Sequence, residues 1–371
     1  MKFMAKCSNK KNKNIKEPEF KPRFKINEYR DMADVNPYTP SQIREAYWIP
    51  ADANGEGKTI AIIDAYGNKN LLSDLNEFSK KFNLPDANVE IKYPDGEPTV
   101  IDKGWAIETN LDVQWAHALA PLAKILVVIS KDATVGGLFN AVNYAVAYGA
   151  KIISMSWGGN EFREQVSLDP IFNKKGIAFF AASGDSGTIV YPSSSPYVIS
   201  VGGTSLSLDA GGKRTGDEIA WVGSGGGISE YEPKPSWQNI SCSSLRIKNN
   251  RMTPDVAFFA DSFPGLAVYV GTKVSNGSGW MGIGGTSAAA PCWAAITASL
   301  KTSNEEYVNF QEILYKLYCN NLNDKKDVFY DIKNGNNKNY YAGEGYDYVT
   351  GLGSPIVNNL LDLYSDEESN S

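Results

Sequence analysis

An alternation of short apolar runs with longer amphipathic segments constrains the fold of this chain more than any other sequence feature. Four runs have the length and composition of buried strands: TIAIID (59–64), AKILVVIS (123–130), AKIISMSW (150–157) and IAFFAASG (177–184). Between them, segments such as LLSDLNEFSKKFN (71–83) place apolar residues at helical spacing. This alternation predicts an α/β fold with a parallel β-sheet flanked by helices on both faces. Functional residues are then expected just past the C-terminal ends of the strands.

The chain has 371 residues, of which 42% are hydrophobic, so it is long enough to bury the core of one large domain. Its first 37 residues are rich in lysine and asparagine and show no periodicity, which is typical of a flexible arm. We therefore predict a flexible arm over residues 1–37, a single domain over residues 38–365 and an acidic tail over residues 366–371.

The net charge of −6 argues against nucleic acid as a partner of this protein. No apolar run reaches the length of a membrane-spanning helix, so we expect no membrane partner, and we expect a monomer. The N-terminal lysines are not followed by an apolar core, so we expect no secretory signal. The default location is then the cytoplasm, or the outside of the cell if the sequence is that of a processed form.

The four cysteines, at positions 7, 242, 292 and 319, show neither paired spacing nor a CxxC motif. A disulfide framework is therefore not expected, although a single bond stays open. Cys292 lies within an apolar helical run and is interpreted as a small core residue.

Ser287 stands between a glycine turn and an apolar helical run in the stretch GIGGTSAAAPCWAAI (282–296). Turns of this kind often present a nucleophilic serine, although serine is also favoured as a helix N-cap. The chain contains a single histidine, His117. The central question is therefore which group would accept the proton of the serine.

The segment GWAIETNLDVQWAHALAP (104–121) is predicted to be a helix that carries a pair of carboxylates. At about 100° per residue, Glu108 and Asp112 lie about 40° apart, whereas His117 lies about 180° from Glu108. We therefore interpret His117 as a structural histidine and Glu108 as the base, with Asp112 behind it. Two adjacent carboxyl groups share a proton, which suits catalysis at acid pH. The alternative for the pair is an ordinary solvated helix face.

Asp185 follows the last predicted strand in FFAASGDSG, where a parallel sheet exposes its loops. In its protonated form it would donate a hydrogen bond to an oxyanion, alongside the backbone N–H of Ser287. This role again requires low pH, because an ionised carboxylate would repel the developing charge. The alternative for Asp185 is stabilisation of a glycine-rich turn.

Several stretches together resemble the sedolisin family, the serine-carboxyl peptidases: ETNLDVQWAHALAP, SMSWGG, AASGDSG with YPSSSPYVISVGGTSL, SGGGISEYEPKPSWQ and GGTSAAAP. They run in the family's order over nearly the whole domain. The resemblance implies a subtilisin-like fold and an acid-acting endopeptidase whose substrates are peptides or unfolded proteins. It makes Ser287 the nucleophile and Glu108 the general base. Asp112 becomes the partner of the base, and Asp185 becomes the acid of the oxyanion hole.

Two alternatives stay open beside this interpretation: a tripeptidyl exopeptidase of the same family, and a catalytically silent scaffold that binds peptides. Members of the family usually carry a long folded prosegment, whereas only residues 1–37 precede the domain here. The control of such an enzyme before activation is therefore not predicted.

The resemblance also implies a set of residues around the catalytic group. Asp64 and Trp157 would extend the proton network. The backbone of a bound peptide would pair with two glycine-rich segments, represented by Ser156, Gly158, Gly159, Ser224, Gly225 and Gly226.

A glycine-rich stretch near the C-terminus (329–355) carries two carboxylates, Asp331 and Asp347. Calcium takes six to eight hard oxygen ligands, and glycines allow backbone carbonyls to converge, although such loops are usually solvated turns. The resemblance implies one Ca²⁺ ion held by these two side chains and by the carbonyls of Ile332, Gly343 and Gly345.

Overall fold

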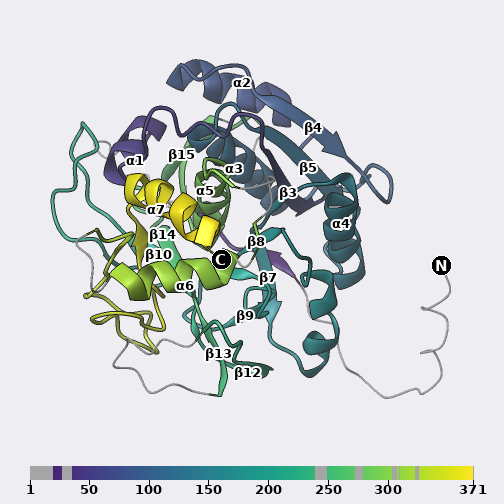
Figure 1. Ribbon diagram of the computed structural model, residues 1–371. Helices are drawn as coiled ribbons and strands as arrows, with labels where there is room; N and C mark the ends of the chain where they lie inside the picture. The colour runs from purple at the N-terminus through teal and green to yellow at the C-terminus, as the bar shows by residue number, and fades with distance from the viewer. Residues whose placement is uncertain are drawn as a thin grey trace, which may run out of the picture.

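An eight-stranded sheet forms the centre of the computed structural model, which describes residues 20–26, 36–238, 249–271, 279–302, 307–308, 310–321 and 326–370. The strand order is β11-β10-β8-β6-β3-β5-β4, with β14 also paired to β10 (Figure 1). All pairs are parallel except β10 with β11. The strands are β3 (Thr59–Ala65), β4 (Asn88–Lys92), β5 (Lys124–Ser130), β6 (Ile152–Met155), β8 (Ala178–Ala182), β10 (Ile199–Ser205), β11 (Ile219–Ala220) and β14 (Val256–Phe259).

Helices cover both faces of this sheet, as predicted (Figure 1). Ile60 and Ile62 of β3 point into a core shared with α1, α2, α3 and α5, whereas Ile63 points into a second core shared with α4. This alternation follows from the period of two along a strand. The helices are α1 (Pro40–Ala46), α2 (Leu71–Phe82), α3 (Lys103–Leu119), α4 (Val135–Tyr148), α5 (Thr286–Ala298), α6 (Phe310–Asn321) and α7 (Val357–Asn370).

Short strands form small sheets around the central one, and two of these sheets take up the start of the described chain. One has the order β1-β7-β9 and the other β15-β16-β2. The remaining strands pair as β12 with β13 and β17 with β18. Their bounds are β1 (Lys21–Pro22), β2 (Lys25–Ile26), β7 (Trp157–Asn160), β9 (Val190–Tyr191), β12 (Gly227–Pro233), β13 (Asn250–Thr253), β15 (Leu266–Val270), β16 (Gly279–Gly284), β17 (Phe329–Tyr330) and β18 (Ser354–Pro355). Two short 3₁₀ helices span Arg163–Ser167 and Asp169–Ile171.

Two predicted boundaries need correction. Within the predicted arm, residues 20–26 form β1 and β2, because their backbone groups find partners on the edges of β7 and β16. The predicted tail continues α7 as far as Asn370. The rest of the arm, residues 1–19 and most of 27–37, lies outside the described residues, as does residue 371.

The cysteines differ in state. Cys292 is free and buried in α5, as predicted. Cys319 of α6 is disulfide-bonded, so the one bond that the sequence left open is present. None of the helices described here is both long and apolar enough to cross a membrane.

Candidate active site

The site is built where α3 packs against α5. α3 begins after Asp102, whose side chain caps the helix by accepting from the N–H of Trp105 at 3.0 Å. Glu108 and Asp112 lie four residues apart on this helix, and both are completely buried. The alternative interpretation of this pair as a solvated helix face is therefore excluded.

Ser287 is the second residue of α5 and is completely buried. The N-cap of this helix is Gly285, which has a φ of 109° that favours glycine, so Ser287 is not the cap. The backbone N–H of Ser287 and its hydroxyl thus both belong to the first turn of α5, where peptide N–H groups have no partner within the helix.

Three buried carboxyl groups act on one another beneath Ser287. Burial raises the pKa of Glu108 well above its usual value, and the nearby Asp112 and Asp64 raise it further. Burial and Asp64 likewise raise the pKa of Asp112, and burial raises the pKa of Asp64 to about 7. Within the described chain, neither oxygen of Glu108 or Asp64 has a hydrogen-bond partner. The cluster therefore retains protons at pH values where an exposed carboxyl group would be ionised.

Ser156 connects the serine to this cluster. The Ser287 hydroxyl donates to the carbonyl oxygen of Ser156 at 3.0 Å. The Ser156 hydroxyl donates to Asp112 Oδ1 at 2.9 Å and lies 3.2 Å from the carbonyl oxygen of Ser287. Ser287 also lies close enough to Glu108 for its hydroxyl to lower the pKa of that carboxyl group.

Asp185 lies in the loop after β8 and contacts Thr286, the residue before Ser287. Its Oδ1 accepts from the backbone N–H and from the hydroxyl of Thr286, both at 2.9 Å. Its Oδ2 is buried and has no partner among the described residues. Burial raises the pKa of this carboxyl group to about 6, although the contacts with Thr286 oppose the shift. The two hydrogen bonds from Thr286 to Oδ1 thus fix the orientation of Asp185, whereas Oδ2 is left without a hydrogen-bond partner among the described residues.

Residues Phe20–Ile26, here called the cleft segment, run through this site as an extended peptide. Lys21 pairs with Gly158, and the N–H of Arg23 donates to the carbonyl oxygen of Ser156 at 3.1 Å. Farther along, Lys25 pairs with Gly284 of β16. The cleft segment is therefore held as a strand before and after the point where it passes Ser287.

Arg23 is the residue of the cleft segment that meets the serine. Its carbonyl oxygen accepts from the backbone N–H of Ser287 at 2.8 Å, and its own N–H donates to Ser287 Oγ at 2.9 Å. A Cβ atom placed on Gly285 would lie 2.4 Å from this carbonyl oxygen and 2.7 Å from Asp185 Oδ2. The carbonyl group and the free oxygen of Asp185 thus flank the same glycine.

The predicted peptide-binding residues divide into two groups. Ser156 and Gly158 contact the cleft segment, whereas Gly159 pairs on its other side with Tyr191 of β9. The second segment lies beside the loop that carries Asp185: the N–H of Gly225 donates to Gly184 at 2.7 Å, the hydroxyl of Ser224 donates to Val349 at 2.7 Å, and Gly226 lies against Tyr348 and Pro254. None of these three is hydrogen-bonded to the cleft segment in the described structure.

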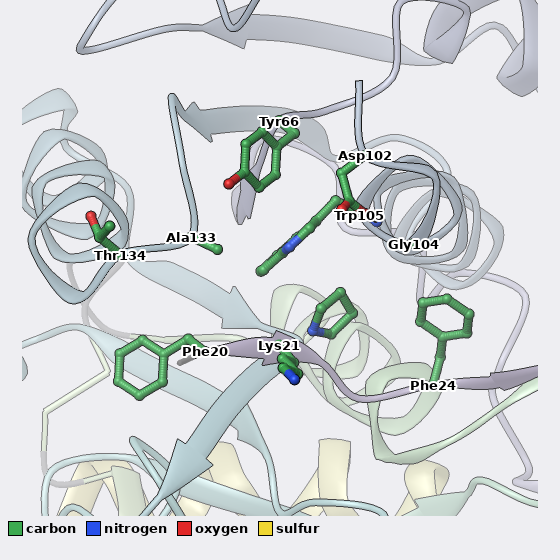
Figure 2. Close-up of a pocket in the computed structure, with 10 residues that line it drawn as sticks. Phe20, Lys21, Phe24, Tyr66, Asp102, Gly104, Trp105, Ala133 and Thr134 are labelled. Atoms are coloured by element: carbon green, nitrogen blue, oxygen red, sulfur yellow. Dashed lines mark hydrogen bonds between the residues drawn. The ribbon is translucent and has the colours of Figure 1, made fainter. Parts of the chain in front are cut away.

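A cavity of about 630 Å³ opens beside the cleft segment (Figure 2). The residues that line this cavity were not identified from the sequence as functional. They come from the loops after β3 and β5 and from the start of α3. Figure 2 shows Trp105 extending from α3 toward the cleft segment. In the sequence, the only signal that the lining residues belong to a functional site was their position past the ends of parallel strands. The lining residues outside the cleft segment are Tyr66, Asp102, Gly104, Trp105, Ala133 and Thr134.

Trp157 and His117 have structural contacts. The indole N–H of Trp157 donates to the carbonyl oxygen of Ile63 at 2.7 Å, so it fixes the end of β3 next to Asp64. His117 is buried, and its Nε2 lies 3.0 Å from the carbonyl oxygen of Pro85. Burial lowers the pKa of His117, and the helix turns this residue away from Glu108 as predicted.

The predicted calcium loop brings its two carboxylates together. Asp331 accepts from the N–H of Gly345 at 3.1 Å, and Asp347 accepts from the N–H of Gly343 at 3.2 Å. Burial raises the pKa of the Tyr318 hydroxyl, and both carboxylates raise it further. Burial raises the pKa of both carboxyl groups, in Asp347 to about 6, and a bound cation would offset this cost.

The donor set of this loop fits calcium only with the help of the backbone. No group of three or more His, Cys, Asp or Glu side chains that could hold a metal occurs in the described part of the chain. The carbonyls of Ile332, Gly343 and Gly345 accept no hydrogen bond from another described residue, so these oxygens are free to act as ligands. Oxygen donors of this kind suit calcium rather than zinc.

A family model described as the Subtilase family matches residues 104–338. Kumamolisin from Bacillus sp. is 34% identical over 87% of this chain, and tripeptidyl-peptidase 1 from Dictyostelium discoideum is 28% identical over 78%. The chain spans 63% and 52% of the lengths of these two relatives.

Among solved structures, the chain is similar to Pseudomonas sedolisin, a serine-carboxyl proteinase complexed with two molecules of pseudo-iodotyrostatin. The TM-score is 0.78 and the sequence identity 27%, and the match covers 90% of this chain and 99% of that one.

Proposed function

The chain belongs to the subtilase family and, within it, to the sedolisins, and from this premise we propose that it is an acid-acting serine-carboxyl endopeptidase. The similarity to the solved structure of Pseudomonas sedolisin also confirms the subtilisin-like fold that the sequence resemblance implied. The observation that carries the proposal is the contact of Ser287 with a peptide carbonyl, the 2.8 Å hydrogen bond from its N–H to Arg23.

In the proposed mechanism Ser287 Oγ attacks the carbonyl carbon of the bond to be cut, and its proton moves to Glu108. Glu108 and Asp112 share one proton before the attack, so Glu108 can accept while Asp112 stabilises the pair. The burial of both carboxyl groups supports this role, because it keeps the pair partly neutral at acid pH. The proton then passes to the leaving amine, and water releases the acyl group from Ser287.

The negative charge that develops on the carbonyl oxygen needs two donors. The backbone N–H of Ser287 is one, and protonated Asp185 is the other, through its unpartnered Oδ2. One donor of this kind contributes roughly 3–4 kcal/mol to lowering the barrier. The donation is available only while Asp185 is neutral, so we propose that the reaction slows above the pKa of about 6.

The course of the cleft segment favours an endopeptidase over a tripeptidyl peptidase. An enzyme that releases tripeptides ends its cleft three residues before the bond to be cut. Here that third residue is Lys21, and the chain continues past it to Phe20, which is buried. The cleft thus accepts a chain that extends in both directions. A silent scaffold is not favoured, because it would have no need of the buried Ser287, Glu108 and Asp112 together with Asp185.

We also propose that one Ca²⁺ ion stabilises the loop between α6 and α7. Asp331 and Asp347 would supply carboxylate oxygens, and Ile332, Gly343 and Gly345 would supply backbone carbonyls. The ion would neutralise two partly buried carboxylates and hold the loop in place; it takes no part in the reaction at Ser287.

The test is hydrolysis of casein, or of a fluorogenic peptide, between pH 3 and pH 8 by the wild type and by Ser287→Ala. We expect a maximum in the acid range and no activity above background in the variant. Ser299→Ala, at the other end of α5, is the matched control and should keep full activity. Unchanged hydrolysis by Ser287→Ala would remove this residue as the nucleophile, and a maximum in alkaline buffer would remove the carboxyl groups.

A further inference from the structure

A second group of buried acidic side chains joins β12 to the segment that follows β7. Glu232 of β12 is completely buried, and Asp169 of the second 3₁₀ helix is only 5% exposed. Neither residue belongs to the proposed catalytic group or to the proposed calcium loop. Burial of two adjacent carboxyl groups is costly unless each finds a partner, so their contacts carry information about their role.

Gln165 of the first 3₁₀ helix connects the members of this group. Its side-chain amide donates to Glu232 Oε1 at 2.7 Å and to Glu161 Oε1 at 3.1 Å. The same oxygen of Glu161 accepts from the hydroxyl of Ser229 in β12, and that hydroxyl accepts from the backbone N–H of Glu232 at 2.9 Å. A network of polar side chains therefore ties β12 to the chain that follows β7.

Asp169 completes the network from the second 3₁₀ helix. It is hydrogen-bonded to Glu232, and its Oδ1 accepts from the hydroxyl of Tyr191 in β9 at 3.2 Å. The second oxygen of Glu232, Oε2, is buried and has no partner among N–H and O–H groups of the described residues. Two carboxyl groups can be hydrogen-bonded to each other only if one of them carries a proton. The contacts therefore require a protonated carboxyl group that faces a carboxylate.

The charged groups around this pair do not replace the proton. Glu161, at the end of β7, adds a further acidic side chain that acts on Glu232. Arg251 of β13, the strand paired with β12, is engaged in a buried ion pair of its own. Arg163 of the first 3₁₀ helix is exposed, and its charge acts on Tyr231. The pair is thus surrounded by acceptors and by other acids, and a proton is what makes it stable.

Burial shifts the protonation of the pair in the direction that these contacts require. Burial and the adjacent Asp169 raise the pKa of Glu232 to about 8. Burial also raises the pKa of Asp169, although its hydrogen bonds with Ser195 and Glu232 oppose the shift. Glu232 is therefore the group that holds the proton and loses it as the pH rises through about 8. Above that pH two carboxylates would repel each other in a buried position.

We propose that Glu232 and Asp169 form a pH-operated carboxyl latch, which a shared proton closes in acid and which opens when both groups are ionised. The latch joins the continuations of two segments that flank the cleft. β7 carries Gly158, which pairs with the cleft segment, and β12 directly follows the predicted peptide-binding residues Ser224–Gly226. In acid the latch holds these continuations together. The inference goes beyond the proposed peptidase function and does not depend on it, because only a proton moves.

The first test is hydrogen exchange, measured by mass spectrometry at pH 5 and pH 9 with exchange times scaled to the chemical rate. The sample is the full chain with Ser287→Ala, so that self-cleavage does not change it. Residues 161–172 and 227–233 report on the latch, and β5, in the middle of the central sheet, is the reference. We expect the protection of the two latch segments, relative to β5, to fall at least about tenfold between pH 5 and pH 9, because opening exposes their amides locally. A constant ratio would overturn the latch, since any loss of protection would then be global.

The second test replaces each carboxyl group of the pair by an amide, which can donate to its partner without ionising. In Glu232→Gln the side-chain oxygen can still accept from Gln165 while the amide donates to Asp169; in Asp169→Asn the amide donates to Glu232. Either change, made in the same Ser287→Ala chain, should reduce the relative loss of protection to less than about threefold. Glu230→Gln, an exposed carboxyl on the same strand, is the matched control and should retain the full loss.

A full loss of protection in a folded Glu232→Gln or Asp169→Asn variant would overturn the assignment to this pair. If one variant fails to fold, the other decides, and if both fail, the comparison of pH 5 with pH 9 in the parent chain decides. Retention of the loss in Glu230→Gln, together with its reduction in the two amide variants, would establish the latch. None of these outcomes depends on whether the protein cuts peptides.

Discussion

The backbone N–H of Ser287 donates to the carbonyl oxygen of Arg23 at 2.8 Å, and the N–H of Arg23 returns a hydrogen bond to Ser287 Oγ at 2.9 Å. The two contacts hold the peptide bond between Arg23 and Phe24 beside the nucleophile. Both contacts involve the serine that the proposed mechanism uses, so the cleft segment lies where the proposed function would place a substrate.

Cleavage of the protein's own chain is expected from this arrangement. At about pH 4 the wild type should produce a fragment that begins at Phe24, because the Arg23–Phe24 bond is the one presented to Ser287. Intact-mass and N-terminal analysis would detect it. Ser287→Ala should stay whole, with peptide hydrolysis lowered by roughly 10⁴-fold or more. Cleavage after Arg23 that continues in Ser287→Ala would point to another protease.

Replacement of Glu108 by glutamine should lower kcat/KM by roughly 10²- to 10⁴-fold, since the amide cannot accept the serine proton. The same change removes a buried ionisable group, so Tm at neutral pH should hold steady or rise. Measurement of activity and Tm on the same samples separates the two effects. A Glu108→Gln enzyme that is both fully folded and fully active would exclude Glu108 as the base.

The alkaline limb of the pH–rate profile should belong to Asp185. Its pKa is raised to about 6 by burial, so it is a donor below that pH and an anion above it. Activity should therefore fall as the pH rises through about 6. Asp185→Asn keeps a donor that does not titrate, so its profile should lose this limb even where its maximal rate is lower. A variant profile that superimposes on that of the wild type would refute the assignment.

A chelator should lower thermal stability if calcium binds the folded loop. A ligand that binds only the native state contributes about 2.7 kcal/mol at one hundred times its dissociation constant. We expect Tm in EDTA to lie several degrees below Tm in calcium, with recovery when calcium is restored. Asp331→Asn should lower Tm in calcium buffer and abolish the response to EDTA. Identical melting curves with and without EDTA for the wild type would argue against the ion.

Stability should be greater in acid than at neutral pH. Burial raises the pKa of Asp64 to about 7 and that of Glu232 to about 8, above the values of about 4 expected in an unfolded chain. Below about pH 4 both states hold these protons. As the pH rises toward 8 the folded state retains protons that the unfolded state releases, so this contribution is progressively lost.

Tm should accordingly fall by roughly 5 °C or more between pH 4 and pH 8. Asp64→Asn removes one of the groups responsible and should make the decline shallower. Glu56→Gln, an exposed carboxyl near the start of β3, should leave it unchanged. A Tm that increases steadily toward pH 8 would contradict this account.

Local periodicity was sufficient for the parts of the site that lie on regular elements. The angle of 100° per residue places Glu108 and Asp112 on one face of α3 and His117 on another, and the structure confirms that separation. Ser287 and Asp185 could also be located, because each follows a recognisable turn next to a buried element.

The cleft segment could not be predicted, because its two strands exist only through pairing with β7 and β16, more than a hundred residues away in sequence. A lysine-rich stretch with a single buried side chain, Phe20, carries no periodic signal of its own. The same reason explains the placement of Ser224–Gly226. Their position beside the Asp185 loop depends on contacts with Gly184 and Val349, and their binding of a peptide stays a prediction. Nor could the bond to Cys319 be inferred from cysteine spacing alone.

The strand geometry of the cleft segment has a consequence for what a target protein must do before it is cut. From Phe20 to Ile26 the backbone is held extended against β7 and then β16, so an α-helix or a tightly folded loop could not enter in its native shape. Under the proposed function, a target would have to unravel over such a stretch first, and acid commonly loosens folded proteins. The conformational stability of each target would then govern how quickly it is degraded, in addition to its sequence.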